Sequence, residues 1–102
     1  MHFIVTLTPT IDAADALDNQ PGGPGPLFDF IADRYHPEAF WVSAGERSVS
    51  WIIDAPDATA LHELVHIASL KGRTTPQFTP IIFGADAAKV VPAAIQAAAE
   101  AP

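Results

Sequence analysis

Residues Phe40–Phe83 read FWVSAGERSVSWIIDAPDATALHELVHIASLKGRTTPQFTPIIF, and this stretch decides the fold. Two strand-like segments, Phe40–Ala44 and Ser48–Ile53, flank a short turn made of glycine and charged residues. A helix is predicted next, over Asp57–Lys71, and a further strand over Gln77–Phe83. The stretch therefore predicts strand, turn, strand, helix and strand in direct succession.

The predicted helix has a start, an apolar stripe and an end that can be read from its residues. Asp57 follows Pro56 and is the expected N-cap, because a short acidic side chain accepts a hydrogen bond from the first free N–H groups. Gly72 is expected at the C′ position. At 100° per residue, one apolar stripe facing the sheet contains Ala58, Leu61, Leu64, Val65 and Ala68.

The residues before this stretch complete the order of elements. His2–Thr8 alternates in polarity and predicts a strand with one apolar and one mixed face. A short helix is predicted over Leu27–Tyr35. The order β-α-β-β-α-β is that of the ferredoxin-like α+β sandwich with an antiparallel sheet. We expect one such domain over residues 1–84 and an alanine-rich helical C-terminal tail over residues 85–102.

For two other segments, the sequence allows more than one structure or role. Asp18–Pro26 is rich in proline and glycine, so we expect a loop, either a mobile connection or a lid over a pocket. The tail has a weak helical pattern that Pro92 is expected to break or kink. The turn residues Glu46 and Arg47 are expected to form a solvated charge pair.

The composition of the chain indicates which kinds of partner it can bind. The chain has 102 residues, a formal charge of −7, five Lys and Arg residues and no cysteine. An acidic chain with few cations does not favour binding to nucleic acid or to an anionic membrane surface. No apolar run approaches the ~18–20 residues that span a bilayer, so we expect a cytoplasmic location. Hydrophobic residues make up 49%, a high share for a small domain, which favours a homodimer that buries apolar surface.

The segment His62-Glu63-Leu64-Val65-His66 matches the zinc-peptidase pattern H-E-x-x-H. Histidines at i and i+4 on a helix can share one metal ion, but the next turn has no third ligand. We therefore predict no metal here. A two-histidine site completed by water, a loop residue or a neighbouring subunit stays open as the alternative.

A small set of side chains could carry acid–base chemistry or line a pocket. His36 follows the first helix and is the preferred acid or base, because histidine titrates near neutral pH. His62 and His66 are the next candidates. The candidates for contact with a substrate are Tyr35, Trp41, Trp51, Thr6 and His2. Filling of the core or of an interface is the alternative role of the two tryptophans.

Several of these segments resemble the dimeric α/β-barrel superfamily, and within it the muconolactone-isomerase-like group. The resemblance rests on the Phe40-Trp41 strand, the Gly45 turn, the Ser50–Asp54 strand and the Leu61-His62 pair, together with the opening His2–Val5 strand and the Phe78–Phe83 strand. It implies dimers whose sheets pack face to face and enclose a pocket in each subunit. The first helix departs from the group, because it is short and follows the Pro/Gly loop.

The resemblance implies an isomerase or cyclase that needs no metal and no organic cofactor. Such an enzyme would move a proton on a small, cyclic, mostly apolar metabolite, in a pocket at the dimer barrel. Neither a substrate nor a catalytic residue carries over from the group. The alternative function is a non-catalytic module that binds a small molecule or a metal, or serves in assembly.

Overall fold

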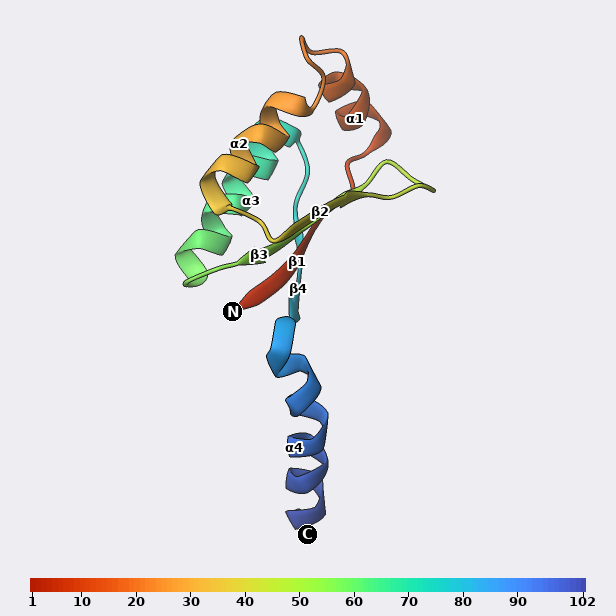
Figure 1. Cartoon of the computed structure of the whole chain (residues 1–102). Coiled ribbons are helices and arrows are strands. Elements are labelled where there is room, and N and C mark those ends of the chain that lie inside the picture. Colours follow the sequence, from red (N-terminus) through yellow and green to blue (C-terminus); the bar gives the residue numbers. More distant parts are fainter.

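The computed structural model describes residues 1–102 (Figure 1). Four α-helices, one short 3₁₀ helix and four strands make up the fold. Their bounds are β1 His2–Leu7, α1 Ile11–Asp18, α2 Gly25–Tyr35, β2 Ala39–Val42, β3 Val49–Asp54, α3 Ala58–Gly72, β4 Gln77–Ile81, η1 Gly84–Asp86 and α4 Ala87–Glu100. None of the helices has the length and apolar character that a membrane crossing requires.

The four strands form one sheet in the order β2-β3-β1-β4, and every neighbouring pair is antiparallel. The predicted α+β class with an antiparallel sheet is therefore confirmed. Figure 1 shows α2 and α3 on one side of the sheet, while α4 extends from the end of β4 away from them. The two ends of the molecule thus carry different helices.

The core lies between the sheet and the helices α2 and α3. Strand side chains alternate between faces, so every second residue of β1 and β3 points into this core. The buried apolar cluster contains Val5, Leu7, Ile31, Trp51, Ile53, Leu64 and Ala68. The intervening strand residues belong to the opposite face of the sheet, to which no helix contributes core residues.

The helices α1 and α3 each begin with a side-chain N-cap. The Thr10 hydroxyl accepts a hydrogen bond from the Ala13 N–H at 3.2 Å, and the Asp57 carboxylate accepts one from the Ala60 N–H at 2.9 Å. Each cap satisfies an N–H group that has no partner inside its helix. The predicted N-cap of α3 is confirmed.

The Pro/Gly loop is shorter than predicted because helices extend into it from both sides. α1 is a full helix of eight residues, and its Ala13 and Ala14 side chains are buried. α2 begins at Gly25 with Pro26 in its first turn, where the missing N–H of proline costs nothing. The prediction of a loop over the whole of Asp18–Pro26 was therefore wrong at its ends.

Two further predictions about helix ends need correction. Gly72 is the last residue of α3, and the left-handed position belongs to Arg73, with φ 51°. Gly72 is buried instead, and a Cβ at this position would lie 3.4 Å from Leu27 Cδ2 of α2. The predicted break at Pro92 does not occur, because α4 is one helix that includes this residue.

Candidate functional site

One face of the sheet is free of helices, and we call it the open face. Residues paired across antiparallel strands point to the same side, so the register identifies its members. The open face contains His2, Ile4, Thr6, Ala39, Trp41, Ser50, Ile52, Asp54, Gln77, Thr79 and Ile81. It therefore combines an apolar patch with hydroxyl groups and one histidine, and three of the predicted substrate contacts lie on it.

The hydroxyl groups of the open face lie beside its aromatic residue. Thr6 Oγ1 and Ser50 Oγ share a hydrogen bond of 2.9 Å. Trp41 is paired with Ser50 across β2 and β3, and its side chain is 41% exposed. Only one of the two hydroxyl protons is used in their shared bond, so the other can be donated to a carbonyl oxygen.

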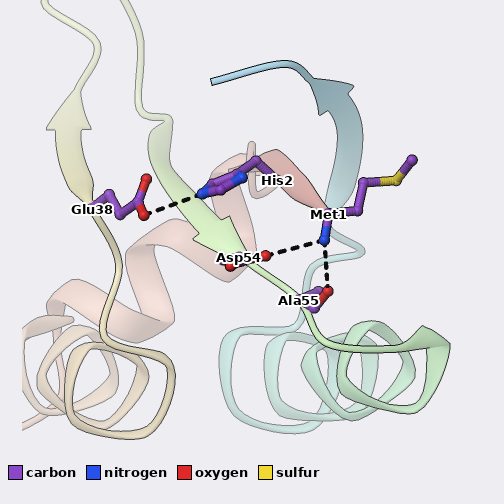
Figure 2. A network of polar contacts seen from close by, with 5 residues as sticks. All are labelled: Met1, His2, Glu38, Asp54 and Ala55. Atoms are coloured by element: carbon purple, nitrogen blue, oxygen red, sulfur yellow. Dashed lines mark hydrogen bonds and ion pairs between the residues drawn. The ribbon is translucent and has the colours of Figure 1, made fainter. Parts of the chain in front are cut away.

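His2 is the histidine of the open face, and it has a carboxylate partner. His2 Nε2 lies 3.1 Å from Glu38 Oε1, and Figure 2 shows the ring lying across β3 toward Glu38. The ring also lies against Phe83, with ring centroids 5.5 Å apart. Glu38 is held in place by its backbone N–H, which donates to the Ile52 carbonyl at 2.9 Å.

The same end of the sheet, where β1 begins and β3 ends, carries a second ion pair. The N-terminal amine of Met1 donates to Asp54 Oδ1 at 3.1 Å and to the Ala55 carbonyl at 3.2 Å (Figure 2). The hydrogen bond from this amine lowers the pKa of Asp54. Asp54 is paired with His2 across β1 and β3, so two carboxylates lie near the histidine.

This arrangement is suited to proton transfer. A neutral imidazole accepts a proton at one nitrogen, and a carboxylate that contacts the other end of the ring orients it and stabilises its charged form. Glu38 contacts Nε2 of His2, which leaves Nδ1 as the nitrogen for exchange with a bound molecule. The pair resembles a base with its orienting group, placed beside apolar side chains.

The predicted catalytic residues, and the predicted substrate contact Tyr35, lie away from the open face. His36 ends α2 in a left-handed conformation, with φ 48°, and is exposed. Tyr35 is on the helix side of the sheet, and its hydroxyl donates to Glu63 Oε1 at 2.6 Å. Partial burial, followed by this hydrogen bond, raises the pKa of Tyr35 to about 12. The phenol therefore stays protonated at neutral pH.

The two histidines of the H-E-x-x-H segment lie on the outer surface of α3, whereas its Leu64 is in the core. His62 and His66 are exposed, with ring centroids 4.6 Å apart. Between them in sequence, Glu63 forms an ion pair with Arg34, in which both carboxylate oxygens accept guanidinium hydrogen bonds. No group of three His, Cys, Asp or Glu side chains that could hold a metal ion occurs. The glutamate of the motif thus links α3 to α2.

The Glu63 ion pair predicts a dependence of stability on pH. Hydrogen bonds from Arg34, and then from Tyr35, lower the pKa of Glu63 from 4.5 to about 2. A carboxylate with a depressed pKa stabilises the fold above its ordinary pKa, and the stabilisation is lost as the pH falls from about 4.5 toward about 2. We expect Glu63→Gln to lower the urea midpoint at pH 7, and the difference from the unchanged chain to shrink as the pH falls from about 4.5 toward about 2.

The control for this measurement is Asp33→Asn, which removes an exposed carboxylate from α2 that forms no ion pair. Urea titrations of the three chains between pH 2 and pH 7 would provide the comparison. An equal change in both variants would show that net charge, rather than the contact with Arg34, determines the effect.

The two tryptophans have separate surroundings. Trp51 is 1% exposed in the core, with its ring centroid 5.7 Å from Phe28 and 5.3 Å from Phe40. Trp41 lies on the opposite side of the sheet. The structure therefore does not bring the two predicted substrate contacts together.

A cavity of about 300 Å³ lies on the helix side, and we call it the helix-side pocket. Its apolar wall includes Leu7, Leu17, Leu27, Phe28, Val42 and Val49. No histidine lines it. Its size and lining suit a small apolar molecule.

Arg47 forms ion pairs with two residues of α1 at the edge of this pocket. Its guanidinium donates to Asp15 at 2.9 Å and to Asp18 at 2.5 Å. The hydrogen bonds to Asp15 and then Asp18 raise the pKa of Arg47. The predicted charge pair of Arg47 with Glu46 is thus replaced by contacts with α1, and both Arg47 and Asp18 line the pocket.

Sequence reasoning missed Glu38 and Arg47 as site residues. The period-two pattern of β1 does place His2 on the mixed face of its strand. No local pattern links His2 to Glu38, 36 residues later, because β2 and β3 must fold before the two side chains meet. Comparisons with protein-family models, curated proteins and solved structures give no match.

Proposed function

We propose that the chain is a ferredoxin-like sandwich that pairs with a second copy through the open face. The strand order β2-β3-β1-β4 supports the first part, because β1-α2-β2 and β3-α3-β4 then each enclose a strand from the other half. The second part is supported by the side chains of Ile4, Ile52 and Trp41, which adjoin one another on a face without helices. A second sheet packed there would close a dimeric α/β barrel.

Within that barrel, the protein acts as an isomerase or cyclase on a small, cyclic, mostly apolar carbonyl compound. His2 takes a proton from a carbon next to the carbonyl, and the electron pair moves into the conjugated system. The same imidazole returns the proton to another carbon, so the product is an isomer and no oxidant or reductant is consumed. Trp41 and Ile52 hold the ring, and the free hydroxyl proton of the Thr6–Ser50 pair binds the carbonyl oxygen.

One observation carries this proposal: His2 is the histidine that has a carboxylate partner, and it lies on the open face. His2 therefore takes the role that the sequence assigned first to His36. General acid–base assistance of this kind contributes about 10²–10⁴-fold to a rate.

The test measures proton exchange, because the substrate is not known. A panel of small unsaturated lactones is incubated with the protein in D₂O, and NMR records deuterium entering the carbon next to the carbonyl. We expect exchange with at least one compound, and a loss of about 10²-fold or more in His2→Gln. Glu38→Gln should lower the rate less, because the base stays while its orienting charge is removed.

The matched control is Asp29→Asn, which removes an exposed carboxylate of α2 and should leave the rate unchanged. Loss of exchange in His36→Gln with full exchange in His2→Gln would return the base role to His36. If no compound of the panel exchanges its proton and the dimer binds none of them, the proposed isomerase or cyclase function is wrong.

A second candidate function, non-catalytic binding of a small apolar molecule, is favoured by the helix-side pocket. This pocket is lined mostly by apolar side chains and contains no histidine to act as a base. Native mass spectrometry distinguishes the two functions. A small molecule that stays bound when Trp41 of the open face is replaced by alanine belongs to the helix-side pocket, which Trp41 does not line.

A further inference from the structure

The tail helix α4 is amphipathic and has little contact with the rest of its own chain. At 100° per residue, one side of α4 presents Val90, Val91, Ala94, Ile95 and Ala98, while Lys89, Gln96 and Glu100 share the other side. Val91 is 60% exposed and Ile95 is 65% exposed. Every residue of α4 is exposed, and its one substantial contact is with η1. The apolar stripe therefore has no partner within the chain.

The overall dimensions confirm that α4 projects from the domain. The radius of gyration is 16.7 Å, whereas a compact chain of about 100 residues has about 13 Å. The longest axis measures 57 Å, against 28 and 23 Å for the others. Isolated helices of this length are only marginally stable in water, and Pro92 removes one backbone hydrogen bond. Such a helix needs a surface to pack on.

A groove of about 690 Å³ on the outer side of α2 and α3 offers such a surface. Its apolar lining includes Phe30, Ile67 and Leu70, and the exposed fractions of Phe30 and Leu70 are 52% and 74%. Large, adjacent, exposed apolar side chains on a small domain indicate a binding surface. Grooves of this kind accept the apolar side of an amphipathic helix.

Charge at the groove is complementary to charge on α4. Lys71 and Arg73 lie on its edge, and neither forms an ion pair within the chain. Lys89 of α4 is the third of the five Lys and Arg residues that forms no ion pair. Glu100 is the last residue of α4, while Asp86 is its N-cap and is followed by Lys89 in the first turn. The carboxylate of Glu100 is therefore the one that would meet the basic edge without a cation beside it.

The helix and the groove of one chain lie at opposite ends of the molecule. Figure 1 shows α4 leaving the end of β4, whereas the start of α2 and the end of α3, which border the groove, lie at the far end of the sheet. We propose that α4 of a second copy of this chain occupies the α2–α3 groove, with Val91 and Ile95 against Phe30 and Leu70. This contact is separate from the open face and does not depend on the proposed activity.

The contact joins two different surfaces, which determines what assemblies it forms. Two copies close on themselves only if each inserts its helix into the other, and otherwise the contact continues into rings or chains. Combined with pairing through the open face, it would extend the assembly beyond a dimer.

Because the chain has no cysteine, single introduced cysteines test this contact directly. Leu70→Cys and Ile95→Cys chains, one of them labelled with ¹⁵N, are mixed and oxidised, and the cross-linked pairs are identified by mass spectrometry. We expect the mixed disulfide to form at least about tenfold faster than when Gln96→Cys, on the polar side of α4, replaces Ile95→Cys. In the unmixed chains, Val91→Asp should lower the mass measured by light scattering.

Three outcomes would overturn the proposal. The first is equal cross-linking from positions 95 and 96. The second is the absence of any mixed disulfide at 100 µM protein. The third is a disulfide within one chain in the double variant Leu70→Cys/Ile95→Cys, seen as a monomer, because α4 would then cover the groove of its own chain.

Discussion

Replacing Trp51 by alanine is expected to lower the free energy of unfolding by about 3–5 kcal/mol. Trp51 is 1% exposed and contacts Phe28 and Phe40 edge-on or tilted, so the substitution leaves a cavity in the middle of the core. The native state of a domain of this size is stable by about 5–15 kcal/mol, so the loss is a large share of the total. Urea denaturation followed by circular dichroism measures it.

Trp41→Ala is the matched comparison on the other side of the sheet. Trp41 is 41% exposed, and its removal from one chain should cost less than about 1 kcal/mol. Its effect should instead appear in the binding of a second copy or of a ligand at the open face. Equal destabilisation by the two substitutions would contradict the assignment of Trp51 to the core and of Trp41 to the open face.

Aspartate at two adjacent positions of β3 is expected to affect two different properties, the stability of the fold at Ile53 and the association of two copies at Ile52. Ile53 is 1% exposed in the core, and a carboxylate there costs more than about 4 kcal/mol, so Ile53→Asp should show no cooperative unfolding. Ile52 faces the open side of the sheet. Ile52→Asp should fold but raise the dissociation constant of the proposed sheet-to-sheet dimer by roughly 30-fold or more, the effect of losing a central interface residue.

Both substitutions are best made in a chain that also carries Ile95→Asp, so that α4 does not contribute to association. Sedimentation equilibrium then reports the open face alone. A monomer at 100 µM in this background without any change at Ile52 would count against pairing through the open face, and it would leave the α4 contact untouched.

Local patterns were sufficient for most elements of the fold. The alternation in β1 and β3, the capping residue Asp57 and the apolar stripe of α3 each depend on residues a few positions apart. The same alternation placed Phe3 and Val5 on one side of β1 and His2 and Thr6 on the other. The ends of elements were less accurate, as at Gly72 and Arg73, where the helix continues one residue further than predicted and Arg73 takes the left-handed position.

The candidate site required contacts that no local pattern contains. His2 meets Glu38 only after β2, β3 and β1 have been placed side by side. Glu63 was part of a metal-binding pattern by sequence, yet Arg34 of the neighbouring helix holds its carboxylate. Arg47 likewise contacts α1 rather than its neighbour in the turn.

The sequence by itself determined the α+β class, the strand faces and the amphipathic nature of α3, because each follows from backbone geometry repeated every two or 3.6 residues. Only the tertiary structure decided which charges pair, which face of the sheet lacks helices and where α4 points. These properties depend on residues far apart in the chain, whose distances are set by packing of the whole domain rather than by their neighbours in sequence.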